Sequence, residues 1–263
     1  IDNVDSGVIT HGSLVTVENV SVTGEIVSHY GVKFGPGDRC LGYNVSVLSM
    51  AAHNLSVNSL AHGMVYSKCT VRRGRLDQHG GLNFQNLFDD LIVRDAKRGW
   101  ELFAQGGNAD MMPLHGAFNT FWNIRLIFAP DSVDDIPHPM YGSINHGAAV
   151  RLVGIRANIP VRIHFYNVDP WIEGTNRVLA DEYASLYKWQ LARRLGQDSA
   201  RVARLKHDMV LTLFGDEEEV PADEPLPINC ALYNWTYRAM DLQYPGQGAT
   251  SLDWVITPLD AES

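Results

Sequence analysis

A short phrase, asparagine followed by an aliphatic residue, recurs between Val17 and Phe128 of the chain. It occurs within VENVSV, GYNVSV, AHNLSV, FQNLFDDLIV and FWNIRLIF, where the asparagines are Asn19, Asn44, Asn54, Asn86 and Asn123. Neighbouring copies lie 25, 10, 32 and 37 residues apart. This irregular spacing fits a coil of about 20–25 residues that carries insertions better than it fits a strict short repeat.

The segments around these copies alternate in the manner of β-strands. In GSLVTVENVSVTGEIV, every second residue from Leu14 to Val22 shares one face. No segment between Ile1 and Phe165 has a convincing helical periodicity. Strands this short form either an antiparallel sandwich, with asparagine marking turns, or a solenoid. Asparagines at equivalent turns can hydrogen-bond from coil to coil, so we predict an all-β parallel β-helix over residues 1–167.

The pattern changes after about Pro160. LADEYASLYKWQLARRL, from Leu179 to Leu195, has apolar residues at helical spacing, and Gly196 is a plausible helix end. A second helix is expected to run to about Met209. We therefore predict a C-terminal extension over residues 168–263, with helices near 179–209, that caps the last coil.

Composition narrows the classes of function. The net charge of -9 argues against a nucleic-acid partner, because such binding relies on lysine and arginine neutralising phosphates. No apolar run approaches the roughly 20 residues of a membrane span, so no membrane partner is expected. The three cysteines, which are widely separated, predict at most one disulfide and no zinc site. The first residues contain no signal peptide.

The phrases above, together with SKCTVRRGRLDQHGGLNFQNLFDD and MMPLHGAFNTFWNIRLIF, resemble the right-handed parallel β-helix proteins of the pectin-lyase-like superfamily. The resemblance covers about Ile1 to Asn167. It implies a secreted or periplasmic protein that cleaves a polysaccharide. The aspartate sets of polygalacturonase-like hydrolases and the calcium ligands of pectate lyases are not evident. Calcium is a possible cofactor, but no residue is assigned as its ligand. Members usually have further N-terminal coils, so the expected partners include such a missing part or a second copy of the chain.

The stretch GRLDQHGG places a polar cluster directly before an apolar run. Arg75, Asp77 and His79 fall on one face if the stretch is a strand. Such a row can hold a uronate or sulfate and move a proton, with the carboxylate fixing the imidazole tautomer. The alternative is a surface ion pair of Arg75 with Asp77, and a turn capped by His79.

Other polar and aromatic residues extend this candidate site. Five histidines precede glycine, and four of them, His62, His79, His115 and His146, are expected to form a stripe on one flank. The catalytic candidates are His79, Asp77, Arg75, His115 and Glu101. The substrate-binding candidates are Arg73, Asn83, Trp100, Asn108, Asp110, Asn119 and His146.

The resulting functional hypothesis is a lyase acting on an acidic polysaccharide, with His79 as the base and Tyr66 or Tyr141 as the acid. One alternative is a glycoside hydrolase that pairs Asp77 with Glu101 or Asp110. Another is a non-catalytic glycan-binding or structural β-helix, such as a spike or adhesin module.

Overall fold

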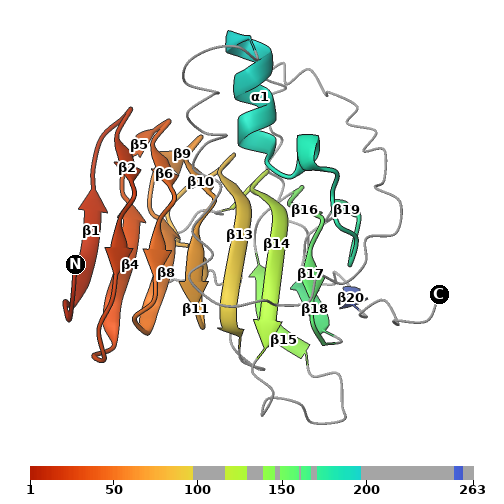
Figure 1. Ribbon diagram of the computed structural model, residues 1–263, viewed down its shortest axis with the longest axis horizontal. Helices are drawn as coiled ribbons and strands as arrows, with labels where there is room; N and C mark the ends of the chain where they lie inside the picture. Colours follow the sequence, from red (N-terminus) through yellow and green to blue (C-terminus); the bar gives the residue numbers. More distant parts are fainter. Residues whose placement is uncertain are drawn as a thin grey trace.

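The computed structural model describes most of the N-terminal part of the chain and several later segments. Side chains are described for residues 1–96, 116–128, 149–159 and 171–196, and the backbone alone for residues 139–145, 161–166 and 252–256. The chain forms a parallel β-solenoid of about five turns, and its coils follow one another along the long axis of the molecule (Figure 1). The predicted stacking is confirmed, and the antiparallel sandwich is excluded.

One wall of the solenoid is a four-stranded parallel sheet, which we call the narrow sheet. Its strands, in spatial order, are β1 (Ser6–Thr10), β4 (Ser28–Phe34), β8 (Ala51–Val57) and β12 (Leu76–Gln78). Each strand pairs in parallel with the next coil's equivalent strand.

A second wall is an eleven-stranded sheet, which we call the wide sheet. Its main path consists of β2 (Thr16–Glu18), β6 (Leu41–Tyr43), β10 (Val65–Ser67), β13 (Leu87–Ala96), β14 (Thr120–Phe128), β16 (Arg151–Val153) and β19 (Trp171–Glu173). Beside this path lie β3 (Ser21–Val22), β7 (Ser46–Val47), β11 (Thr70–Arg72) and β17 (Arg156–Ala157). Parallel pairing between coils thus continues to β19, a few residues beyond residue 167, where the coils were predicted to end.

Two small sheets complete the described strands. The strands β5 (Gly37–Asp38) and β9 (Ala61–His62) pair at a corner between the walls. Further along the chain, β15 (Pro139–Asn145) pairs in parallel with β18 (Val161–Tyr166), and β20 (Leu252–Ile256) is antiparallel to β18.

The strand register gives the coil length directly. Thr16, Leu41, Val65 and Leu87 lie at equivalent positions of successive coils. Hydrogen bonds between equivalent turns of these coils join residues that are 25, 24 and 22 positions apart in the chain. The next step, from Asn86 to Asn119, spans 33 positions, which places an insertion after β13. The predicted coil length and the presence of insertions are both confirmed.

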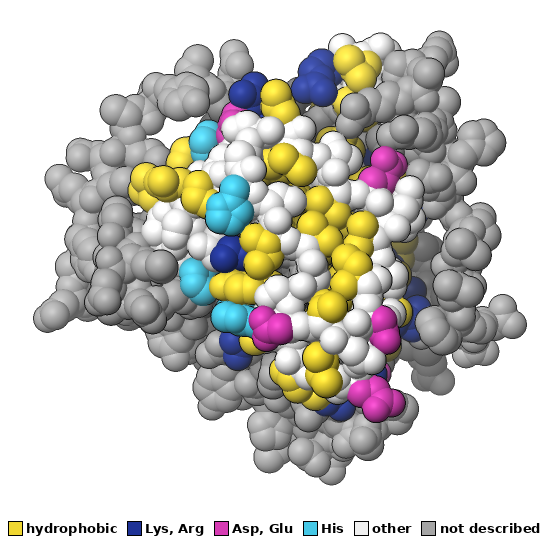
Figure 2. Space-filling model, turned by 90° about the vertical axis from the view of Figure 1, so that its left-hand side faces the viewer, with side chains coloured by type: hydrophobic (Ala, Val, Ile, Leu, Met, Phe, Trp, Pro, Cys, Tyr) yellow, Lys and Arg dark blue, Asp and Glu magenta, His cyan; other side chains and the backbone are white. Residues whose placement is uncertain are grey.

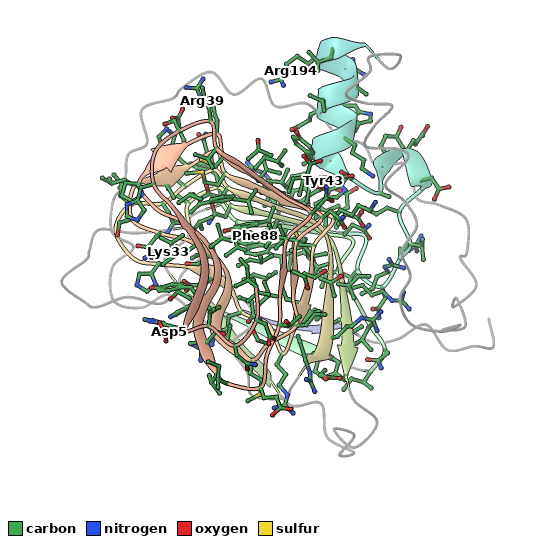
Figure 3. All side chains as sticks on the ribbon, turned by 60° about the vertical axis from the view of Figure 1, so that its left-hand side comes forward. Asp5, Lys33, Arg39, Tyr43, Phe88 and Arg194 are labelled. Carbon is green, nitrogen blue, oxygen red and sulfur yellow. The ribbon has the colours of Figure 1, made fainter. Side chains whose placement is uncertain are left out.

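The interior of the solenoid is filled by stacked aromatic rings. The Phe34 and Tyr66 rings lie 4.7 Å apart, Tyr66 and Phe88 5.6 Å, and Phe88 and Phe121 5.0 Å between centroids. All four side chains are fully buried, and Figure 3 shows Phe88 inside the coils. Gly42 occupies the equivalent position of an earlier coil, where a Cβ atom would lie 2.6 Å from the Tyr66 ring. The close stacking of successive coils therefore limits the size of the side chains that can face the interior.

The predicted asparagine ladder is present for only some of the copies. Asn19 and Asn44 occupy equivalent left-handed turns, with φ of 57° and 51°, and Asn44 Nδ2 donates to Asn19 Oδ1 at 2.7 Å. Asn123 occupies the same turn in a later coil and donates to Asp90 at 3.1 Å. Asn54 and Asn86 depart from the prediction, because they lie inside the coils and bond to the backbone of neighbouring coils.

The helix α1 (Leu186–Leu195) packs on the outer side of the wide sheet (Figure 1). Leu191 contacts Leu41 and Tyr43, and Figure 3 shows Tyr43 near the base of the helix. The predicted start at Leu179 is wrong: a 3-10 turn, η3 (Asp181–Tyr183), precedes α1, and Ser185 caps the helix by accepting from the Lys188 N–H. Gly196 ends the helix as predicted. The second predicted helix, to Met209, lies outside the described residues.

Asp89 anchors the start of α1 on the wide sheet. Its carboxylate accepts from Ser185 Oγ at 2.6 Å, from the Leu186 N–H at 2.7 Å and from Ser67 Oγ at 2.6 Å. Burial raises the pKa of Asp89 to about 7, although the Ser185 and Ser67 hydroxyls partly offset the effect.

This anchor predicts a pH dependence of stability. Because the folded state holds the Asp89 proton more tightly than the unfolded state does, its contribution is greatest at low pH and is lost as the pH rises from about 4 through 7. Denaturant titrations should show the free energy of unfolding falling over this range, with a slope of at most about 1.4 kcal/mol per pH unit from this one group. In Asp89→Asn, which keeps an acceptor for α1, the slope should be smaller; an unchanged slope would contradict this role.

Candidate functional site

The outer face of the narrow sheet gathers polar side chains from successive coils. The strand register aligns Lys33 of β4 with Ser56 of β8, and Ser56 with Asp77 of β12. A second row aligns Tyr30 with His53. Since parallel coils bring equivalent positions within about 4.8 Å of each other, residues one coil apart in the chain become neighbours here.

Asp77 lies at the centre of this cluster. Its Oδ2 atom accepts from Ser56 Oγ at 2.7 Å and lies 3.2 Å from Nδ1 of His79 and 3.2 Å from Nδ1 of His53. The Asp77 side chain is 0 % exposed, whereas those of His53 and His79 are 11 % and 14 % exposed. The carboxylate is therefore fully enclosed, and the two imidazoles lie between it and the solvent.

The electrostatics of the cluster favour an ionised Asp77. Burial opposes ionisation, but the polar contacts and charges of His53 and His79 outweigh it and hold the pKa of Asp77 well below its usual value. An ionised carboxylate can only accept hydrogen bonds, so the His79 Nδ1 in contact with it carries the proton. In the neutral ring, Nε2 is then the basic nitrogen.

Aromatic rings and a lysine continue the surface beside the histidines. His29, Tyr30 and His53 form a ring cluster, with centroids 4.3 Å apart for His29 and Tyr30 and 5.0 Å for Tyr30 and His53. Lys33 Nζ lies 4.4 Å from the centroid of the Tyr30 ring, and Figure 3 shows Lys33 projecting from the outer face of the narrow sheet. Figure 2, which views the N-terminal end, shows several histidine side chains in a loose row down the left side of the coloured surface. Burial, and then the Asp77 charge, raise the pKa of Tyr30.

The structure brings two of the predicted catalytic residues, Asp77 and His79, into direct contact. Arg75 lies just before β12, where its backbone N–H donates to Asn54 Oδ1 at 2.9 Å. Arg73 lies at the preceding turn, and one guanidinium nitrogen is 2.8 Å from Met50 Sδ of the neighbouring coil. The proposed contacts of the two arginines with a substrate stay predictions.

Asn83 and Asn119, predicted to bind substrate, are buried in the structure. Asn83 donates to the His79 carbonyl and accepts from the Gly116 N–H, and Asn119 Nδ2 donates to Gln78 Oε1 at 2.8 Å. Their amides thus tie the segment that carries His79 to the next coil. This arrangement gives both residues a positioning role, and contact with substrate stays a prediction.

The other candidates lie outside the described residues. These are Trp100, Glu101, Asn108, Asp110, His115 and His146. Tyr66, considered as an acid, is fully buried and donates to the carbonyls of Val32 and Ser56. It belongs to the core and does not reach the outer face. His62, expected in the histidine stripe, lies in β9 and stacks on Phe84.

Sequence reasoning missed His53, Tyr30, Lys33 and Ser56. Each lies in a coil that precedes the one carrying Asp77. The signal that could have found them is the coil length, because counting back one or two coils from Asp77 leads to these strands.

Comparison with known proteins finds no matching family model, no matching curated protein and no matching solved structure. Among the described residues, no helix combines the length and the hydropathy that crossing a membrane requires. The cluster must therefore be interpreted from its own chemistry.

Proposed function

We propose that this chain is a carbohydrate-active enzyme that cleaves an acidic polysaccharide by β-elimination. The observation that carries the proposal is the buried Asp77 carboxylate in contact with Nδ1 of His79. A carboxylate that fixes the tautomer of a neighbouring imidazole is the usual way to prepare a general base.

In the proposed reaction, His79 Nε2 takes the proton from the carbon next to the uronate carboxylate. The electron pair of that C–H bond forms a carbon–carbon double bond, and the bond from the neighbouring carbon to the glycosidic oxygen breaks. The leaving oxygen takes a proton from Tyr30, whose raised pKa keeps the phenol protonated at neutral pH. Lys33, close to the Tyr30 ring, offers a positive charge to the uronate carboxylate.

The shape of the wall supports a polymeric substrate. The narrow sheet presents side chains of equivalent positions at regular intervals along the solenoid. His29, the exposed ring of the cluster it forms with Tyr30 and His53, offers a surface on which a sugar ring can lie. A chain of sugars can therefore contact several coils at once.

Two other functions make different predictions. A glycoside hydrolase would use Asp77 as one of two carboxylates, but its enclosure by Ser56, His53 and His79 favours an orienting role. A glycan-binding or structural β-helix on the same wall would bind saccharide without turnover.

The test is a panel of uronate-containing and neutral polysaccharides incubated with the purified chain. Elimination produces an unsaturated uronate, which absorbs in the ultraviolet, together with new reducing ends. New reducing ends without this absorbance would indicate the hydrolase, and binding without either signal would indicate the non-catalytic module. We expect both signals on an acidic polysaccharide.

A further inference from the structure

The cluster on the narrow sheet also has the composition of a transition-metal site. Three ligand atoms, one each from His53, Asp77 and His79, lie within 4.8 Å of one another. They come from β8, from β12 and from the residue directly after β12. No other such group of three occurs in the part of the chain that the structure describes with side chains.

Two polar atoms of this cluster are buried without a hydrogen-bond partner. These are Asp77 Oδ1 and His53 Nδ1. The His53 nitrogen lies 3.2 Å from Asp77 Oδ2, but in a direction that does not make a hydrogen bond. A buried polar atom left unsatisfied costs about 1–3 kcal/mol, so such atoms usually have a partner. An ion bound among the three side chains would supply it.

The donor set selects the kind of ion. Calcium and magnesium prefer oxygen ligands, whereas two imidazoles with one carboxylate suit zinc and its first-row neighbours. Bonds of about 2.0–2.2 Å at tetrahedral angles place ligand atoms about 3.3–3.6 Å apart. The two separations of 3.2 Å in the cluster are close to this spacing. Ser56 Oγ, at 2.7 Å from Asp77 Oδ2, holds the carboxylate in place, as partners of metal ligands commonly do.

We propose that His53, Asp77 and His79 bind a divalent first-row transition metal ion, with Zn²⁺ the best fit. Three protein ligands leave a fourth position open to water or another small ligand. The site differs from the sequence-based expectation, which assigned no metal ligands and allowed only calcium.

Metal binding has a consequence for catalysis, which rests on the proposed function. An ion on Nδ1 of His79 takes the place of the proton there, so the neutral ring carries its single proton on Nε2, the nitrogen that would otherwise act as the base. The imidazole can no longer accept a proton from the substrate. Zn²⁺ should therefore inhibit cleavage, because His79 cannot bind the ion and accept the substrate proton at the same time.

The experiment titrates the full chain, stripped of metal with a chelator, with Zn²⁺ alone in a calorimeter. We expect one ion per chain. The affinity for Zn²⁺ should fall by more than about 100-fold in His53→Ala and in Asp77→Asn. This loss is larger than the one expected for a residue that only hydrogen-bonds to a metal ligand. The matched controls are His29→Ala, beside the cluster, and His62→Ala, on β9. Both should bind as the wild type does.

Co²⁺ provides a readout that does not depend on any variant folding. Its visible spectrum in the wild-type chain should show low-symmetry coordination with nitrogen ligands and should disappear when Zn²⁺ is added. No saturable binding by the wild-type chain, or wild-type affinity in His53→Ala, would overturn the site. If Zn²⁺ binds as expected but no polysaccharide is cleaved, the metal site stands and the proposed function fails. If cleavage occurs and Zn²⁺ does not inhibit it, the proposed inhibition by metal binding to His79 is wrong.

Discussion

Replacing His79 with alanine is expected to slow cleavage of an acidic polysaccharide by about 10²–10⁴-fold, the usual contribution of a general base. The imidazole is 14 % exposed and contacts the buried Asp77, so it is the group best placed to take a proton from a bound sugar. Because Lys33 and the exposed His29 ring remain, binding of the polysaccharide should change little. Initial rates and a binding assay on the same substrate measure the two effects separately.

The control for this variant is His62→Ala. His62 is also a partly buried histidine at a strand, but it lies in the separate sheet of β5 and β9 and stacks on Phe84. Its loss should leave the rate within about twofold of wild type, because it touches no member of the cluster described above. Near-normal turnover in His79→Ala would remove His79 as the base, whatever the effect on binding.

Replacing Phe88 with alanine is expected to destabilise the fold by about 3–5 kcal/mol. Phe88 is fully buried and stacks between Tyr66 and Phe121, so its removal leaves a cavity between two coils. A domain of ordinary stability has only about 5–15 kcal/mol in total, so this variant should be close to unfolding. Urea or guanidinium titration followed by circular dichroism measures the loss.

The control for the core prediction is Phe88→Leu. Leucine keeps most of the buried volume but has no ring to stack, and the cost should stay below about 1.5 kcal/mol. The difference between the two variants isolates the cavity. If Phe88→Ala costs no more than Phe88→Leu, the aromatic stack does not support the coils.

The fold was predictable because copies of the repeated phrase occupy equivalent turns of successive coils. Asn19 and Asn44, one coil apart, form the hydrogen bond that the stacking hypothesis required. Asn54 and Asn86 share the same local sequence but lie inside the coils. Local sequence thus indicated that coils stack but did not fix which residue occupies which turn, because insertions shift the register.

The candidate site was predictable only within one coil. Asp77 and His79 are two positions apart, and strand alternation alone places them on one face. His53 and Tyr30 come from other coils, and their placement depends on exact coil lengths that the irregular spacing hides. The start of α1 was mispredicted for a similar reason, since Ser185 is held by Asp89, which lies far earlier in the chain.

The central claim is that Asp77 holds His79 with the proton on Nδ1, leaving Nε2 free to act as the base. The ¹⁵N chemical shifts of the His79 ring in the metal-free protein test it most directly, because they distinguish a protonated ring nitrogen from a bare one. At a pH where the ring is neutral, the account predicts a protonated Nδ1 and a bare Nε2. A ring with its proton on Nε2 would contradict it.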